Sequence, residues 1–295
     1  MSRPQRTREE LEHLASSVPF WWHSIDLGQG VVTNGMKSAS LLAKELESLR
    51  LPDLEGKSVL DIGTYDGFYA FEAERQGARR VVALDHYVWS MDVAENIKHW
   101  KDCKQRGVPP GLPHTMPYWR PAELPGKRAF DAARDARGSR VEEMIRDFMT
   151  TNLDEVGSFD VVLYLGVLYH MENPFEALKR VAAVTREVAV IETEAIFVPG
   201  FEHMALCEFF ESNELNADSS NWWAPNRKAL TGMCRAAGFS RAEVVAGPAP
   251  RSLASLVKRL AFPGAYLLAK LPLGKRIASS IPRLNSYRAV VQAWK

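Results

Sequence analysis

The chain has 295 residues, of which 46% are hydrophobic and 25% are charged, and its formal net charge is +1. This length and apolar content allow a sizeable buried core, held as one large domain or as one domain with insertions, and they argue against disorder. The three cysteines lie far apart without a Cys-x-x-Cys pair, which argues against a zinc site or a disulfide framework and favours the reducing cytoplasm. No secretory signal is expected, and the apolar run 260–269 is too short to cross a bilayer.

Basic side chains are concentrated towards the C-terminus. Residues 244–295 contain nine Lys or Arg and no Asp or Glu, so the preceding part carries 28 basic side chains against 36 acidic ones. Such a segment can contact phosphate-bearing partners or an anionic membrane, or it can be a solvated flank that balances the acidic remainder. Contact with a nucleic acid, or with a membrane surface through residues 251–283, is therefore an alternative that the sequence does not favour.

Predicted strands and helices alternate along the chain. Helices are expected at 8–16, 37–49, 69–76, 91–104 and 174–184, and strands at 58–62, 80–85, 141–145, 160–165, 188–192, 241–245 and 287–294. Parallel strands need crossover connections, so this order predicts an α/β fold in which helices cover both faces of a mostly parallel sheet. Ligands of such sheets bind at the carboxyl ends of the strands.

Two segments interrupt this order. Residues 107–126 contain six prolines, so we expect no α-helix there and interpret the segment as a surface strap in preference to a rigid lid. Residues 247–286 mix basic and apolar side chains, a composition compatible with an interfacial amphipathic helix. The predicted organisation is an N-terminal cap with its loop (1–50), a core (51–246), a basic amphipathic insertion (247–286) and the last core strand (287–295).

The first two strands end in a motif for a nucleoside-type cofactor. Strand 58–62 runs into Gly63 and Gly67, and strand 80–85 ends on Asp85, whose carboxylate can accept hydrogen bonds from ribose hydroxyls. A nicotinamide site has the spacing Gly-x-Gly-x-x-Gly, whereas here the order is Asp61-x-Gly63-x-x-x-Gly67. An acid before the first glycine suits a sulfonium or ammonium group and repels a phosphate. The motif therefore favours S-adenosylmethionine over a dinucleotide.

A later motif is more specific. It reads Ser-Phe-Asp-Val-Val-Leu-Tyr-Leu-Gly-Val-Leu-Tyr-His-Met-Glu-Asn-Pro at 158–174, with Phe-Trp-Trp-His-Ser-Ile-Asp-Leu at 20–27 and Asn-Trp-Trp-Ala-Pro-Asn at 221–226. Together these motifs resemble the bacterial class I methyltransferases related to the tRNA wobble-uridine 5-oxyacetic acid (carboxymethyl) transferases, a family with relatives thought to act on sugars or natural products. The resemblance implies a Rossmann-like, seven-stranded, mostly parallel sheet with an antiparallel last strand, an N-terminal helical cap and a basic C-terminal insertion.

The motif and the resemblance together predict a donor site. Asp61 and Gly63 should flank the methionine part of S-adenosylmethionine, Asp85 should hold its ribose, and Asp147 follows the third strand, where related enzymes often contact the adenine. The family often has a glycine where this chain has Tyr65, which should narrow the mouth of the pocket. The full predicted set of cofactor-binding residues is Asp61, Gly63, Thr64, Gly67, Asp85, Asp147 and Gly166.

Tyr169 and His170 are the predicted catalytic residues because they follow the fourth strand, beside the expected methyl group. Histidine is the usual base at neutral pH, although a histidine in an apolar loop can also be structural. In the carboxymethyl branch, the tyrosine matched by Tyr169 holds an extra donor carboxylate, and Arg288 occupies a corresponding position. The lysine expected before the Pro-Phe pair is missing, since Val18 stands there. The resemblance therefore favours ordinary S-adenosylmethionine as the donor.

The predicted acceptor residues are His23, Glu192, Glu194, Trp222 and Asn226. The two glutamates end the fifth strand and could orient the hydroxyls of an acceptor. Together with later carboxylates they could also bind a divalent cation. The spacing of these acids is too loose to indicate a metal site, so no metal is expected. Trp222 and Asn226 resemble an aromatic and amide wall for a sugar, although a tryptophan pair is more often core. The predicted function is methylation of a hydroxyl oxygen on a small polar acceptor, with tRNA wobble-uridine (carboxy)methyl transfer or a silent donor-binding scaffold as alternatives.

Overall fold

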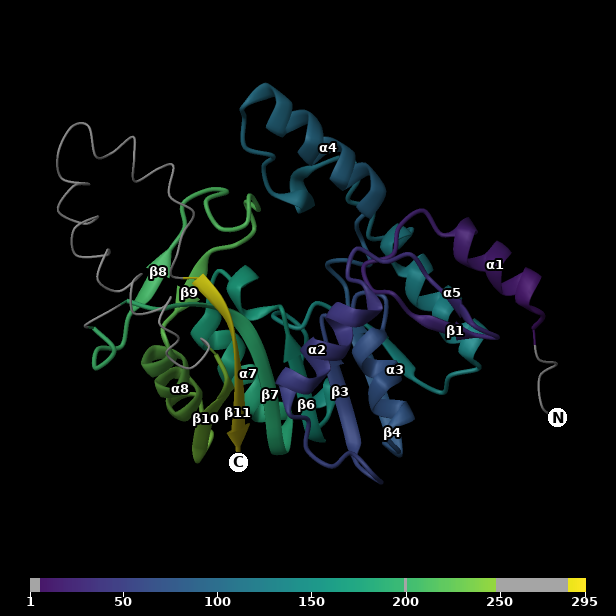
Figure 1. The fold of residues 1–295 in the computed structure, drawn as a ribbon. Coiled ribbons are helices and arrows are strands. Elements are labelled where there is room, and N and C mark those ends of the chain that lie inside the picture. Colours follow the sequence, from purple (N-terminus) through teal and green to yellow (C-terminus); the bar gives the residue numbers. More distant parts are fainter. Residues whose placement is uncertain (1–5, 199–200, 248–285) are drawn as a thin grey trace.

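The computed structural model describes residues 6–198, 201–247 and 286–295. In these ranges seven strands form one sheet in the order β10-β11-β7-β6-β3-β4-β5 (Figure 1). Only β11 runs antiparallel to its neighbours, and the strand order reverses between β3 and β6, which is where ligands bind in open α/β sheets. The strands are β3 (Ser58–Ile62), β4 (Arg80–Asp85), β5 (Glu142–Ile145), β6 (Phe159–Leu165), β7 (Thr185–Ile196), β10 (Arg241–Ala246) and β11 (Ser286–Trp294).

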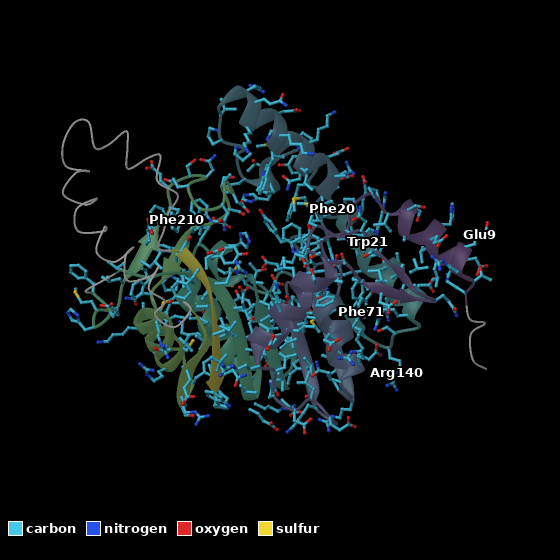
Figure 2. All side chains as sticks on the ribbon, viewed as in Figure 1. Glu9, Phe20, Trp21, Phe71, Arg140 and Phe210 are labelled. Carbon is cyan, nitrogen blue, oxygen red and sulfur yellow. The ribbon has the colours of Figure 1, made fainter. Side chains whose placement is uncertain are left out.

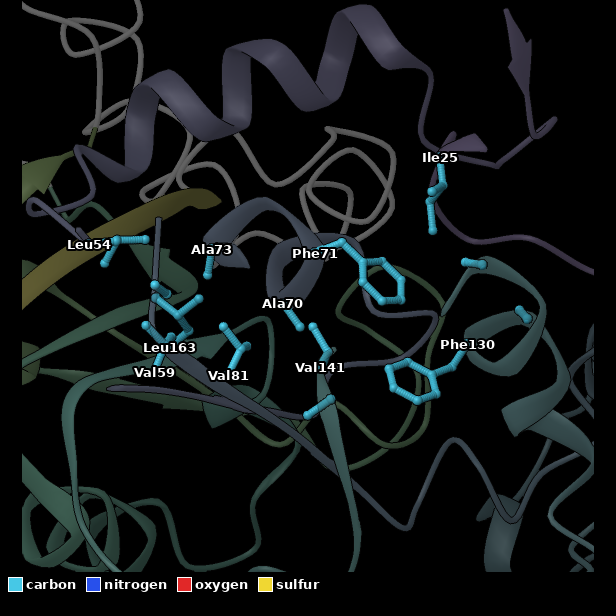
Figure 3. Packing of buried hydrophobic residues seen from close by; sticks show 14 of the residues in the cluster. Ile25, Leu54, Val59, Ala70, Phe71, Ala73, Val81, Phe130, Val141 and Leu163 are labelled. Carbon is cyan, nitrogen blue, oxygen red and sulfur yellow. The ribbon is translucent and has the colours of Figure 1, made fainter. Parts of the chain in front are cut away.

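Helices cover both faces of the sheet because successive side chains of each strand point to opposite sides. Val59 and Leu163 belong to the core under α1, α2, α3 and α5, part of which Figure 3 shows, whereas Leu60 and Val162 belong to the core under α6, α7 and α8. The helices are α1 (Arg8–Ser17), α2 (Ala39–Leu49), α3 (Phe68–Arg75), α5 (Arg128–Arg137), α6 (Leu153–Val156), α7 (Pro174–Val184) and α8 (Arg227–Ala236). The predicted seven-stranded class I methyltransferase fold is therefore confirmed.

One helix, α4 (Val93–Arg106), stands above the edge at which the parallel strands end (Figure 1). Asp92 caps its start and Gly107, in the left-handed conformation, ends it. The proline-rich segment that follows contains only single 3₁₀ turns, η1 (Pro113–Thr115) and η2 (Pro125–Lys127). The hydroxyl of Ser219 donates to the carbonyl of Gly111 at 2.6 Å, so this segment is tied to the loop before β9.

The predicted core strands and long helices match the structure within a few residues at most ends. Helix α2 begins two residues later than predicted because the Ser38 hydroxyl caps it, and β7 continues four residues past its predicted end. Helices α5, α6 and α8 and two small sheets were not predicted: β1 (Asp26–Gly28) with β2 (Val31–Val32), and β8 (Cys207–Phe209) with β9 (Trp223–Pro225). Helix α5 was not predicted because three of its four buried residues are alanines, which give only a weak helical periodicity of hydrophobic side chains.

The predicted amphipathic helix in 247–286 lies almost entirely outside the described residues, since 248–285 are not among them. No helix in the described ranges is both long enough and apolar enough to cross a membrane.

Candidate active site

The donor loop, defined as residues 61–67, connects β3 to α3. Gly63 and Gly67 both have positive φ, +76° and +87°. A Cβ at Gly63 would lie 2.6 Å from a methyl carbon of Val167, and one at Gly67 would lie 2.7 Å from the rings of Phe71 and Phe130. Only glycine fits these two positions, so the glycines form the turn and allow close packing there.

Asp61 is buried at the carboxyl end of β3, with 2% of its surface exposed. Its Oδ2 accepts a hydrogen bond from the Thr64 hydroxyl at 2.7 Å. Burial raises the pKa of Asp61 to about 7, the Thr64 hydrogen bond opposes this, and the nearby Asp85 adds to it. No described Lys, Arg or His forms an ion pair with either acid. A cationic ligand group would therefore stabilise the ionised form of Asp61.

Asp85 ends β4 and lies beside the same loop. Its two oxygens accept the backbone N–H groups of Tyr65 and Val88, each at 3.0 Å. Burial raises the pKa of Asp85 to about 6, and these backbone hydrogen bonds oppose the rise. Tyr65 has φ +58°, a conformation that favours glycine, and its ring stacks on Trp22 at 5.5 Å between centroids. The tyrosine thus packs the donor loop against the cap.

Asp66 was missed by the sequence analysis although it lies inside the donor motif. It is fully buried, and its Oδ2 accepts the backbone N–H groups of Trp22 at 3.0 Å and His23 at 2.8 Å, while its Oδ1 pairs with the His23 imidazole. The available signal was an acid directly before Gly67, at the N-terminus of α3, where negative charge is favourable. His23 is consequently buried against the donor loop, stacked on Phe68 at 5.3 Å.

Two other predicted donor residues lie in different surroundings. Asp147 is exposed after β5, and its carboxylate accepts the Met149 N–H at 2.9 Å and the Thr150 hydroxyl at 3.0 Å, which closes a local turn. Gly166 follows β6 with φ +74°, and its N–H donates to the carbonyl of Glu192 at 2.9 Å. Gly166 therefore lies against Glu192, one of the predicted acceptor residues.

The acceptor corner, defined as Tyr169, His170, Glu192, Glu194 and Arg288, is built where β6, β7 and β11 meet. Arg288 is opposite Glu194 in the antiparallel pair of β11 and β7, so the arginine and both glutamates share one face of the sheet. Its guanidinium binds both oxygens of Glu192, reaches Oε1 of Glu194 at 3.2 Å, and lies 4.9 Å from the centre of the Tyr169 ring. Burial raises the pKa of Glu192, and Arg288 opposes this.

His170 lies in the 3₁₀ turn η3 (Leu168–His170) directly after β6. Its Nδ1 is 3.0 Å from the hydroxyl and 3.1 Å from the carbonyl of Ser220, and its ring centroid is 4.3 Å from that of Tyr169. Burial lowers the pKa of His170 and favours the neutral imidazole, and the Asp218 carboxylate opposes this. The backbone N–H of Trp222 donates to the Tyr169 carbonyl at 2.8 Å, which fixes this tryptophan beside the corner.

The remaining acceptor candidates differ in their surroundings. Trp222 is half-buried and stacks on the exposed Phe209 with an interplanar angle of 13°. Asn226 instead caps α8, and its amide makes three hydrogen bonds to nearby backbone groups, which leaves it little freedom to bind an acceptor. Figure 2 shows Phe20 and Trp21 on the cap side and Phe210, next to β8, on the other side of the upper edge of the sheet.

Two further observations bear on ligands. In the described part of the chain, no group of three or more His, Cys, Asp or Glu side chains is arranged to hold a metal ion. A cavity of about 600 Å³ lies between α1 and the loop of the cap, lined by Phe20, Trp21 and Met36 among others. It contains none of the predicted site residues, so we assign it to neither the donor nor the acceptor.

Comparison with known proteins decides the family. The profile of a family described as "Methyltransferase domain" matches residues 36–244, which is more than half of the chain. The chain belongs to this methyltransferase family. The predicted membership of the methyltransferases is thereby confirmed.

Curated relatives named "tRNA U34 carboxymethyltransferase" match the methyltransferase at low identity. The Colwellia psychrerythraea protein is 26% identical over 196 residues, covering 66% of this chain and 48% of the relative. The Methylococcus capsulatus protein is 23% identical over 217 residues, covering 73% of this chain and 54% of the relative. The chain therefore spans about half the length of these relatives.

Solved structures share the fold of this methyltransferase. The N-terminal domain of EvdMO1, crystallised in the presence of SAH and D-fucose, has a TM-score of 0.55 at 17% identity and covers 100% of this chain and 99% of its own. A phosphoethanolamine N-methyltransferase 2 from Haemonchus contortus has a TM-score of 0.51 at 15% identity, covering 88% of this chain and 53% of its own. At these identities the likeness shows the fold alone.

Proposed function

We propose that this methyltransferase transfers the methyl group of ordinary S-adenosylmethionine to a hydroxyl oxygen of a small polar acceptor, such as a sugar or a natural product. The observation that carries the proposal is the setting of His170. Its imidazole lies at the carboxyl end of β6 and, within the described residues, is held through Nδ1; burial lowers its pKa, which favours the neutral form. A neutral imidazole can take the proton of an alcohol, which is too weakly acidic to ionise unaided at neutral pH.

The charges of the acceptor corner support the ordinary donor. One guanidinium, that of Arg288, is shared by the two carboxylates of Glu192 and Glu194. Arg288, Glu192 and Glu194 together therefore carry a net negative charge when all three side chains are ionised. A donor with an additional carboxylate would meet like charge there, which costs binding energy. Ordinary S-adenosylmethionine lacks this additional carboxylate and meets no such repulsion. The buried Asp61 and Asp85 favour the positive charge of its sulfonium.

In the proposed reaction the acceptor oxygen attacks the methyl carbon in line with the sulfonium. The oxygen–carbon bond forms as the carbon–sulfur bond breaks, the electron pair goes to sulfur, and the hydroxyl proton passes to Nε2 of His170. The enzyme's main contributions are then alignment of the reactants, exclusion of water and removal of this proton. Tyr169, Glu194 and Trp222 would orient the acceptor around the imidazole.

A screen with S-adenosylmethionine tests this function directly. The protein would be incubated with the donor and with separate sets of free sugars, sugar nucleotides, phenolic natural products and unmodified tRNA. D-fucose is a reasonable first sugar because a protein of the same fold was crystallised in its presence. Mass spectrometry should find one added methyl group on a hydroxyl-bearing small molecule. Methylation of tRNA with none of the small molecules modified would contradict the proposal.

The second candidate is modification of the tRNA wobble uridine. The curated relatives carry that name, and Tyr169 and Arg288 lie in contact, as the resemblance implies for the carboxymethyl branch. This candidate requires Arg288 to leave its glutamates or to bind a third carboxylate. A silent donor-binding scaffold is the remaining alternative. It predicts donor binding without turnover on any acceptor.

A further inference from the structure

We propose that Asp218 and Ser220 are positioning residues that fix the tautomer of His170 and strengthen it as a base. The inference rests on the proposed function, because it concerns the same imidazole. Neither residue was identified from the sequence. Both lie in the loop 215–221, between β8 and β9, and reach the acceptor corner only in the folded chain.

The hydrogen bonds of this loop determine where the imidazole proton lies. The Ser220 hydroxyl donates its single proton to Oδ1 of Asp218 at 2.7 Å. Nδ1 of His170 therefore faces two acceptors, the Ser220 hydroxyl oxygen at 3.0 Å and the Ser220 carbonyl at 3.1 Å. Two acceptors require Nδ1 to carry the proton. Nε2, which has no hydrogen-bond partner among the described residues, then presents its lone pair.

The loop itself is held rigidly in place. Asn216 and Ala217 both adopt the left-handed conformation, with φ +58° and +59°, which is costly for residues other than glycine. The Asn216 amide donates to Glu194 at 3.0 Å, and the Ser219 hydroxyl donates to Gly111 at 2.6 Å. The loop is thus anchored to β7 on one side and to the proline-rich strap on the other. Such anchoring is what a positioning role requires.

Several charged groups act on the imidazole. Burial and the cation of Arg288 lower the pKa of His170, whereas Asp218, the Ser220 backbone and Glu194 raise it. Tyr169 lies against the ring. When His170 takes the acceptor proton on Nε2, its Nδ1–H continues to donate to Ser220, whose hydroxyl donates to the Asp218 carboxylate. This chain spreads the new positive charge towards an anion. Such charge spreading helps an acceptor that must lose a proton, as the proposed alcohol must.

Nitrogen NMR of the ligand-free protein tests the tautomer without an acceptor. In the wild type, the proton of neutral His170 should reside on Nδ1. In Asp218→Asn the pKa of His170 should fall, because an anion that stabilises the imidazolium has been removed. Asp53→Asn is the matched control, since Asp53 also accepts a local backbone N–H but lies before β3, at the opposite end of the strands. Protonation on Nε2 in the wild type, or an unchanged pKa in Asp218→Asn, would overturn the proposal.

Kinetics with an identified acceptor give a second readout. Asp218→Asn should lower kcat/KM roughly tenfold, less than loss of the base itself. The acid limb of the pH profile of this variant should move to lower pH, because a His170 of lower pKa loses its proton at a lower pH. Ser220→Ala keeps the carbonyl acceptor and should have a smaller effect. Donor affinity should remain unchanged in both variants, which shows that they are folded. If the His170→Ala variant were active, the proposed function would be refuted. If His170→Ala were inactive but Asp218→Asn were fully active with an unchanged pH profile, only the positioning role of Asp218 would be refuted.

Discussion

Asp61 and Asp85 on the donor side and Glu192 and Glu194 in the acceptor corner are all carboxylates largely withdrawn from solvent, yet in the described residues only the two glutamates are paired with a Lys or Arg side chain. Asp61 and Asp85 are held by hydroxyl and backbone N–H donors, whereas Glu192 and Glu194 share Arg288. A buried carboxylate without a cation is costly unless it is protonated or bound by a positive ligand. A positively charged ligand would therefore stabilise the ionised forms of Asp61 and Asp85, whereas Glu192 and Glu194 already share a cation.

The raised pKa values of the two donor-side acids make the stability of the fold depend on pH. Burial raises the pKa of Asp61 from 3.8 to about 7 and that of Asp85 to about 6. The folded state thus holds protons that the unfolded chain releases near pH 4. These two groups consequently destabilise the ligand-free fold as pH rises from about 4 to about 7. Donor binding should strengthen over the upper part of that range, as the carboxylates become ionised.

The largest expected effect concerns the acceptor corner. His170→Ala should reduce turnover by about a hundredfold or more, because the proposed general base is removed, while donor affinity should remain close to that of the wild type. Steady-state rates and calorimetric titration with S-adenosylhomocysteine would measure the two quantities. His13→Ala, an exposed change on α1, is the control. Near-normal turnover with an unaltered pH profile would make His170 structural.

A substitution on the donor side should change donor affinity directly, unlike the loss of His170. Asp85→Ala should weaken binding of S-adenosylmethionine by roughly 1.5 to 3 kcal/mol, the range for hydrogen bonds to a charged group. Calorimetry should detect both S-adenosylmethionine and S-adenosylhomocysteine, and no heat with NAD. Asp53→Ala in an exposed turn serves as the control. Unchanged affinity in Asp85→Ala would falsify its assignment to the ribose.

Donor choice tests the charge state of the acceptor corner. The protein should prefer S-adenosylmethionine over its carboxylated form by about tenfold or more, since like charges in contact cost binding energy. Glu194→Gln removes one negative charge beside Arg288 and should narrow this preference. Competition binding measures both values. A strong preference for the carboxylated donor in the wild type would place the wobble-uridine function first.

The smallest effect should appear in stability. Asp61→Asn mimics the protonated carboxyl, so at pH 8 the ligand-free variant should be more stable by about 1 kcal/mol, which corresponds to roughly 2 to 4 °C in Tm. This gain in stability should be smaller at pH 5, where Asp61 of the wild type is largely protonated. The variant should also bind the donor more weakly than the wild type. Thermal unfolding at the two pH values, with Asp53→Asn as the control, measures this. A less stable variant at pH 8 would mean that the carboxylate is well solvated.

The sequence predicted the sheet because burial on both faces makes the strands continuous apolar runs, as in 81–84 and 161–165. Short elements such as α6 and β8–β9 were not predictable, since three or four residues carry no clear period. Asp66 was passed over for a different reason. Its position in the donor motif was visible, but its partners, Trp22 and His23, lie more than forty positions earlier in the chain.

By itself the sequence determined the fold class and the placement of the predicted donor motif, because glycine spacing and acids at strand ends are local features set by backbone geometry. Tertiary structure alone decided the electrostatic state of the site. Arg288 reaches Glu192 and Glu194 across 96 and 94 positions, and Ser220 reaches His170 across 50. The charge of a buried group depends on which partners the fold brings within a few ångströms of it, and sequence spacing does not encode those distances.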